Sequence, residues 1–94
     1  DEAVGWLATK ALKHRSGEVR RGAAAALGFS TSAEAAKAVV QRLRKERDPT
    51  VLVALLRAWA RVTSPESVDL PKLALHKDGR VGLALVEALA RKDQ

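Results

Sequence analysis

The chain has 94 residues, which fits one domain with a single core. Hydrophobic residues make up 47% of it and aromatic residues only 3%, which favours closely packed helices of Ala, Val and Leu over a β-sandwich. The absence of Cys excludes disulfides and thiolate metal sites, no apolar run approaches the ~20 residues that cross a membrane, and the net charge is +6.

Three segments of the chain share one pattern, and they begin at Ser16, Asp48 and Asp78. All three residues are good N-caps, because their side-chain oxygens accept hydrogen bonds from the first amides of a helix. The residues that follow place apolar side chains on one helical face at matching positions. The aligned columns are Val19, Val51 and Val81; Ala23, Leu55 and Leu85; Ala26, Ala58 and Ala88; and Leu27, Trp59 and Leu89.

The segments between them repeat as well, since Ser32-Ala33-Glu34 and Ser64-Pro65-Glu66 both read as an N-cap followed by a first turn. Links of two to four residues require sequential helices to pack antiparallel, and such pairs stack to share one core. We therefore expect an all-α, right-handed α-α superhelix, with the middle pair the most apolar. The expected helices are 2–14, 17–29, 33–46, 49–62, 65–77 and 79–91.

These helices divide into a half repeat (1–15), two full repeats (16–47 and 48–77) and a final half repeat (78–94). A chain that starts and ends on half repeats, and opens without Met, is expected to be a piece of a longer protein or a processed one. Pro71 lies inside the expected helix 65–77, where proline removes a backbone donor and clashes with the preceding turn. We expect a kink, a break near Asp69 or a late start of this helix.

The opening Glu18-Val19-Arg20-Arg21-Gly22-Ala23 resembles the first helix of a short HEAT-like repeat, of the PBS-lyase HEAT-like type. Asp48-Pro49-Thr50-Val51 and Asp78-Gly79-Arg80-Val81 resemble the same opening in the next two repeats. The resemblance implies an armadillo-type α-solenoid whose concave face is lined by the second helix of each pair. Such a face binds proteins, or sometimes nucleic acid.

Residues suited to catalysis are few. His14 and His76 each stand near an expected helix C-terminus, where a cationic imidazole is favoured by the helix dipole. Ser32 and Ser64 are interpreted as helix caps. We therefore expect a non-enzyme with no catalytic residue, no cofactor and no metal site.

The resemblance to scaffolding repeats favours a protein or peptide partner. No membrane partner is expected, because no apolar run is long enough to cross a membrane. Residues 1–47 carry most of the positive charge, so nucleic acid is the alternative partner, bound by Lys10, Lys13, Lys37, Arg42, Arg44 and Lys45. A solvated helix face is the simpler explanation of the same charge. Trp6 is predicted to face away from the core, to cover a missing repeat or to stack on a partner. The predicted partner-binding residues are Trp6, Lys10, Lys13, Lys37, Gln41, Arg42 and Lys45.

The last expected helix carries more apolar residues than one neighbouring helix pair can cover. Terminal repeats of a solenoid usually replace such residues with polar ones. We therefore expect further repeats beyond this segment, or self-association through the exposed ends. The apolar residues concerned are Val81, Leu83, Leu85, Val86 and Leu89.

Overall fold

The computed structural model describes residues 2–93, which form six α-helices, one short 3-10 helix and no strand. The expectation of an all-α chain is confirmed. The elements are α1 (Glu2–Thr9), η1 (Ala11–Lys13), α2 (Gly17–Leu27), α3 (Ala33–Leu43), α4 (Pro49–Arg61), α5 (Leu70–Ala74) and α6 (Gly79–Lys92).

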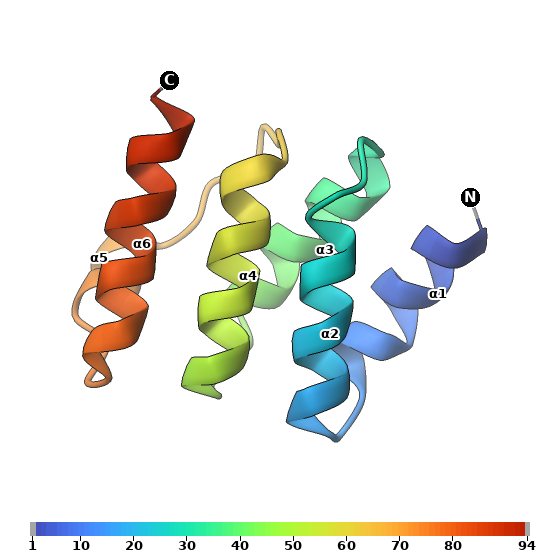
Figure 1. Cartoon of the computed structure of the whole chain (residues 1–94), viewed down its shortest axis with the longest axis horizontal. Helices are drawn as coiled ribbons and strands as arrows, with labels where there is room; N and C mark the ends of the chain where they lie inside the picture. Colours follow the sequence, from blue (N-terminus) through green and yellow to red (C-terminus); the bar gives the residue numbers. More distant parts are fainter. Residues whose placement is uncertain (1, 94) are drawn as a thin grey trace.

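The helices lie in two layers (Figure 1). Helices α2, α4 and α6 form the nearer layer in this view, and α4 packs against both of the others. In the second layer α1 packs against α3, while α3 contacts α4 and α5 contacts α6. Each linker therefore carries the chain from one layer to the other, and the sequence repeat matches this alternation.

Helix α4 is the centre of the core, as its sequence predicts. Val51, Leu52, Leu55 and Leu56 are each no more than 2% exposed. The aligned columns are fully buried only in this helix, because α2 and α6 each have one free side in their layer. Accordingly Val19, Ala26 and Leu89, which share columns with buried residues of α4, are exposed.

One capping arrangement recurs where helices begin. The side chains of the predicted N-caps accept a backbone hydrogen bond from the first turn, as in Asp48 Oδ1 with Thr50 N–H at 2.9 Å. The N-cap's own N–H is also satisfied, because it donates to the side chain two residues earlier. These acceptors are His14 for Ser16 (3.0 Å), Ser30 for Ser32 (3.1 Å), Glu46 for Asp48 (3.2 Å) and His76 for Asp78 (3.0 Å).

The expected helix over residues 65–77 is wrong at both ends, and chiefly in its first part. Helix α5 spans only Leu70–Ala74, with Asp69 as its N-cap and Pro71 in its first turn. A proline in the first turn needs no amide partner, which is why the chain starts the helix late, as one of the stated alternatives predicts. Ser64 Oγ does accept from Glu66 N–H, at 3.2 Å, but it caps no helix.

The expected helix over residues 2–14 is divided. The α-helix ends at Thr9, and residues 11–13 tighten into a 3-10 turn in which His14 N–H donates to the carbonyl of Ala11 at 3.2 Å. Thr9 Oγ1 donates to the carbonyl of Gly5 at 2.6 Å, a local bond that competes with a regular helix. The tighter turn accompanies the full burial of Leu12, which is 1% exposed.

The apolar residues of α6 behave in two ways. Val81 and Leu85 are buried against the rest of the core, whereas Leu83 and Val86 are 62% and 63% exposed. Leu75, in the turn that precedes α6, is 84% exposed. The expectation that α6 keeps uncovered apolar surface therefore matches the side-chain positions.

Candidate functional site

A groove runs between α1 with η1 on one side and α3 on the other, and we call it the α1–α3 groove. Its volume is about 210 Å³. Buried apolar side chains form its floor and polar side chains its rim. The lining residues are Ala8, Thr9, Leu12, Lys13, Glu34, Lys37, Ala38, Gln41, Arg42 and Lys45.

The periodicity of α3 sets the rim of this groove. Ala36, Val40 and the residues beside them face the core, so Lys37 and Gln41, four residues apart, lie on one line along the outer face of α3. Lys45 follows in the turn after the end of the helix and lines the same groove. All three of these side chains are exposed. The sequence spacing thus places two ammonium groups and one amide along one wall of the groove.

The groove brings together five of the seven predicted partner-binding residues: Lys13, Lys37, Gln41, Arg42 and Lys45. The other two lie elsewhere, since Trp6 and Lys10 are exposed on α1 or just after it and do not line the groove. Trp6, 59% exposed, points away from the buried face of α1, as predicted. Its exposure leaves open both stated roles, covering a further repeat and stacking on a partner.

Arg42 is not a free cation, because it belongs to a buried ionic network centred on Glu46. The Glu46 side chain is only 2% exposed, and its Oε1 accepts from Arg20 Nε at 2.8 Å and from Arg42 Nε at 3.0 Å. Its Oε2 accepts from the backbone N–H groups of Arg47 and Asp48, each at 3.2 Å. One carboxylate therefore joins α2, α3 and the link to α4.

The pKa of Glu46 reflects this environment. Burial by itself raises the pKa, but hydrogen bonds from Arg20, from the Asp48 N–H and from Arg42 together outweigh it and hold the pKa below its ordinary value of 4.5. The carboxylate is thus charged at neutral pH and holds Arg20 and Arg42 in place. Its role is structural: it fixes the end of α3, where Arg42 and Lys45 meet the groove.

The pairing of Arg20 with Glu46 was not among the predictions from sequence. Glu46 lies within the basic run Gln41–Arg47, and its spacing of four from Arg42 was the available signal. Its partnership with Arg20 spans 26 positions and depends on the packing of α2 beside the end of α3. Glu34 also lines the groove, one helical turn before Lys37, and its position there was not predicted.

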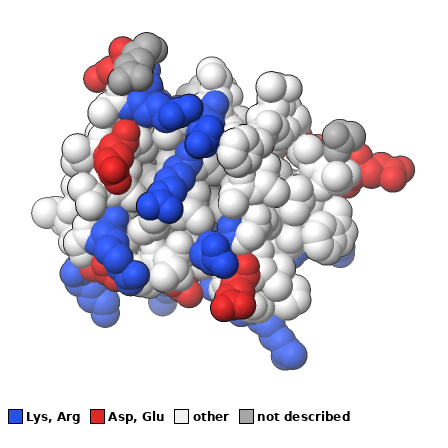
Figure 2. Space-filling model, in the orientation of Figure 1, with Lys and Arg blue, Asp and Glu red and all other residues white. Residues whose placement is uncertain are grey.

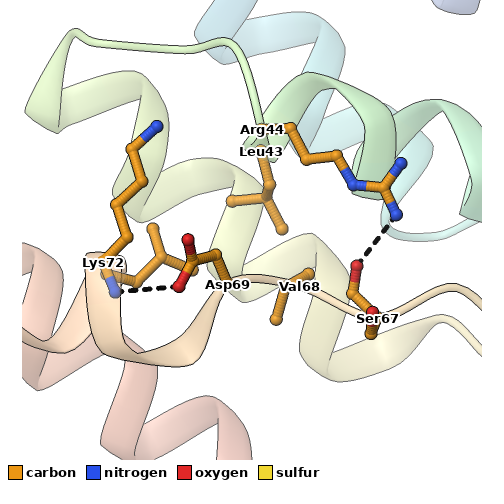
Figure 3. Close-up of a pocket in the computed structure, with 7 residues that line it drawn as sticks. Leu43, Arg44, Ser67, Val68, Asp69 and Lys72 are labelled. Carbon is orange, nitrogen blue, oxygen red and sulfur yellow. Dashed lines mark hydrogen bonds between the residues drawn. The ribbon is translucent and has the colours of Figure 1, made fainter.

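A second groove lies on the other side of α3, between its end and the segment that leads into α5 (Figure 3). Arg44 lines this groove, and its Nη2 donates a hydrogen bond to the carbonyl of Ser67 at 3.0 Å. The same Nη2 lies 3.8 Å from Oε2 of Glu66. Asp69 Oδ1 accepts from the backbone N–H of Lys72. Arg44 is therefore engaged within the fold and faces a different groove from Lys37 and Lys45.

His14 and His76 have equivalent structural roles. In each, Nδ1 accepts a hydrogen bond from the N–H of the next N-cap, at 3.0 Å. The predicted structural role near a helix end is supported, and its observed basis is this hydrogen bond to the following cap.

The α1–α3 groove offers ammonium donors, an amide and an apolar floor, which suits a ligand with carboxylates and a polypeptide backbone. Within residues 2–93 no group of three or more His, Asp or Glu side chains is placed to hold a metal ion. In the same range no helix is long and apolar enough to cross a membrane.

No protein-family model, no curated protein and no solved structure matches this chain.

Proposed function

We propose that this protein is a non-enzymatic interaction module of the HEAT-like scaffold type, which binds an acidic segment of a partner protein in the α1–α3 groove. The alternation of helices between two layers, together with the recurring double cap at the helix starts, supports a repeat scaffold. The observation that carries the binding proposal is the convergence of Lys13, Lys37 and Lys45 on one groove.

The groove's chemistry defines the partner. Lysine ammonium groups on flexible stems pair with carboxylates over a range of positions, which suits an extended acidic segment. Gln41 can donate to a backbone carbonyl and accept from a backbone N–H of the same segment. The buried Leu12 and the neighbouring alanines form an apolar floor, on which small side chains of the partner segment could pack.

Nucleic acid is the second candidate, and the side-chain positions support it less. The six cations considered for it are divided, because Arg44 faces the second groove, Arg42 is bonded to Glu46, and Lys10 lines neither groove. Only Lys13, Lys37 and Lys45 remain as free cations on one surface, and Glu34 lies among them. A phosphate backbone would contact few cations there.

Binding of a labelled peptide of repeated Glu-Gly-Ser units, followed by fluorescence anisotropy, tests the proposal. Changing Lys37→Glu together with Lys45→Glu should weaken binding about tenfold or more, since reversed rim charges repel carboxylates. The matched control is Lys10→Glu with Lys77→Glu, which makes the same change in net charge outside the groove. Equal weakening by the two pairs would show attraction to overall charge alone and would contradict the proposal.

Random-sequence duplex DNA serves as the second probe in the same assay. Tighter binding of the duplex than of the peptide, lost in the Lys37 and Lys45 variant, would replace the protein partner by nucleic acid. A strong dependence on salt would accompany that result.

A further inference from the structure

The layer formed by α2, α4 and α6 carries a second positively charged surface, which the net charge of the sequence does not indicate. Residues 48–94 hold seven Lys or Arg against six Asp or Glu, which is nearly neutral. In the fold, however, several of these acids are used at helix starts: Asp48, Asp69 and Asp78 cap helices. The arginines gather instead on the outer face of α2, α4 and α6, where Figure 2 shows Lys and Arg side chains spread over all three helices.

Three shallow grooves adjoin one another on this face, with volumes of about 230, 330 and 330 Å³. Arg57, in the middle of α4, lines all three of them. Arg21 lines the two grooves nearer α2, and Arg61 lines the two grooves along α4 toward its C-terminal end. The surface is therefore continuous, and we call it the arginine face, made of Arg21, Arg57, Arg61, Arg80 and Arg91.

Most of these guanidinium groups have no carboxylate partner in the described chain. Arg80 is paired with Asp78, at 2.7 Å between Nη2 and Oδ2. Arg61 lies over the exposed ring of Phe29, 4.6 Å from its centroid. Among residues 2–93, no carboxylate forms an ion pair with Arg21, Arg57, Arg61 or Arg91. Uncompensated arginines on one face create a positive potential that attracts anionic groups.

The floor between the arginines is apolar. The grooves contain small residues such as Ala25, Ala54 and Ala84, and Val53 is half-buried. Leu83 lines the groove beside Arg80 and is 62% exposed. The floors accept apolar side chains, while the rims offer planar donors that bind carboxylates in bidentate fashion.

We propose that the arginine face is a second docking surface, which binds a segment of another protein in which Asp or Glu alternates with apolar side chains. The acidic residues of this segment would pair with the arginines, and the apolar residues between them would pack on the apolar floors of the grooves. A phosphate backbone fits less well, because it would leave Leu83 and the alanine floors uncovered and would meet Glu87, which lines two of the grooves. The arginine face lies on the layer of α2, α4 and α6 and the α1–α3 groove lies on the other layer, so the two surfaces are independent.

The test uses the Lys37→Glu, Lys45→Glu protein as its background, in which the α1–α3 groove is disabled, so that the two proposals can fail separately. The probe is a labelled peptide of repeated Glu-Ala-Leu-Glu units, measured by fluorescence anisotropy. The background protein should bind this peptide, and adding Arg21→Glu with Arg57→Glu should weaken binding tenfold or more (about tenfold per 1.4 kcal/mol). Adding Lys10→Glu with Lys77→Glu instead, the same change in charge away from this face, should change affinity less than about threefold.

Peptides with Gln for Glu, or with Ala for Leu, should each bind more weakly than the parent peptide, because the face recognises both features. If the Arg21→Glu, Arg57→Glu protein loses its helical circular dichroism, Arg21→Gln with Arg57→Gln replaces it and should still weaken binding measurably. Three results would overturn the proposal: no binding by the background protein, equal weakening by the arginine and lysine pairs, or tighter binding of random-sequence duplex DNA than of the peptide.

Discussion

Glu46→Gln tests the most connected side chain in the fold. The carboxylate is buried and accepts five hydrogen bonds, three from Arg20 and Arg42 and two from the backbone. Removing its charge leaves two guanidinium groups without their counter-ion and weakens the acceptor that serves the backbone N–H groups of Arg47 and Asp48. The full loss of a buried ionic partner costs about 3–5 kcal/mol, but Arg20 and Arg42 keep 15% and 21% exposure and can reach water, so we expect about 2–3 kcal/mol.

Thermal unfolding at neutral pH, followed by circular dichroism, measures this loss. For a chain of this size the melting temperature should fall by roughly 10–20 °C. Glu87→Gln is the matched control, the same change at an exposed carboxylate, and should alter stability by no more than about 0.5 kcal/mol. A melting temperature for Glu46→Gln equal to that of the control would refute the structural role of the network.

The stability difference between the parent and Glu46→Gln should depend on pH, because the pKa of Glu46 is lowered in the folded chain. A carboxyl group whose pKa is lower in the folded chain stabilises it above the unfolded value, near 4.5, and loses that contribution as pH falls through the folded value. The stability gap between the parent and Glu46→Gln should therefore be full at neutral pH and should narrow as the pH falls below 4.5 through the lowered pKa of the folded chain. A gap that stays constant into acid would contradict this account.

Three further predictions follow from the packing and the caps. Gly28→Ala should destabilise the fold by about 1–3 kcal/mol in urea titrations, because its new Cβ would lie 2.9 Å from the α4 backbone. Gly22→Ala, whose new Cβ has nothing within 4 Å, should instead stabilise α2 by about 0.5–1 kcal/mol, and the opposite order would refute the close approach of α2 and α4. Leu55→Asp should abolish the cooperative melting transition, since an unpaired charge at a fully buried site cannot be solvated; a melt within a few degrees of the parent would show that α4 is not central. Carboxyl NMR titration should give Asp78 a pKa of about 2, lowered chiefly by its hydrogen bond from Arg80, and Arg80→Gln should raise it toward 3.8; an unchanged pKa in that variant would assign the shift to another cause.

Much of the helical pattern could be predicted from local sequence. The N-caps and the period of the apolar columns are short-range signals, and they placed α2, α3, α4 and α6 close to their observed bounds. Helix α5 was overestimated because Ser64-Pro65-Glu66 imitates a helix start, while Pro71 and the cap at Asp69 decide where the helix begins. The 3-10 turn before His14 depends on how Leu12 reaches the core, which a periodic pattern does not contain.

The candidate sites were predictable to different degrees. Lys37 and Gln41 are four residues apart on α3, so their shared surface could be inferred, whereas Lys45 reaches it from the turn after that helix. The Arg20–Glu46 pair and the arginine face join residues far apart in sequence through the packing of α2, α4 and α6. The net charge of residues 48–94 is close to zero and gave no sign of the arginine face. The acidic residues at the helix caps balance the arginines in number, but they lie apart from them in the fold.

The central claim is that the α1–α3 groove receives an acidic segment. The most direct measurement is an NMR titration of ¹⁵N-labelled protein with the Glu-Gly-Ser peptide. The largest amide shifts should map to Lys13, Lys37, Gln41 and Lys45 and should vanish in the Lys37→Glu, Lys45→Glu protein. Shifts spread over the arginine face or around Lys10 instead, or no shifts at high peptide concentration, would contradict the claim.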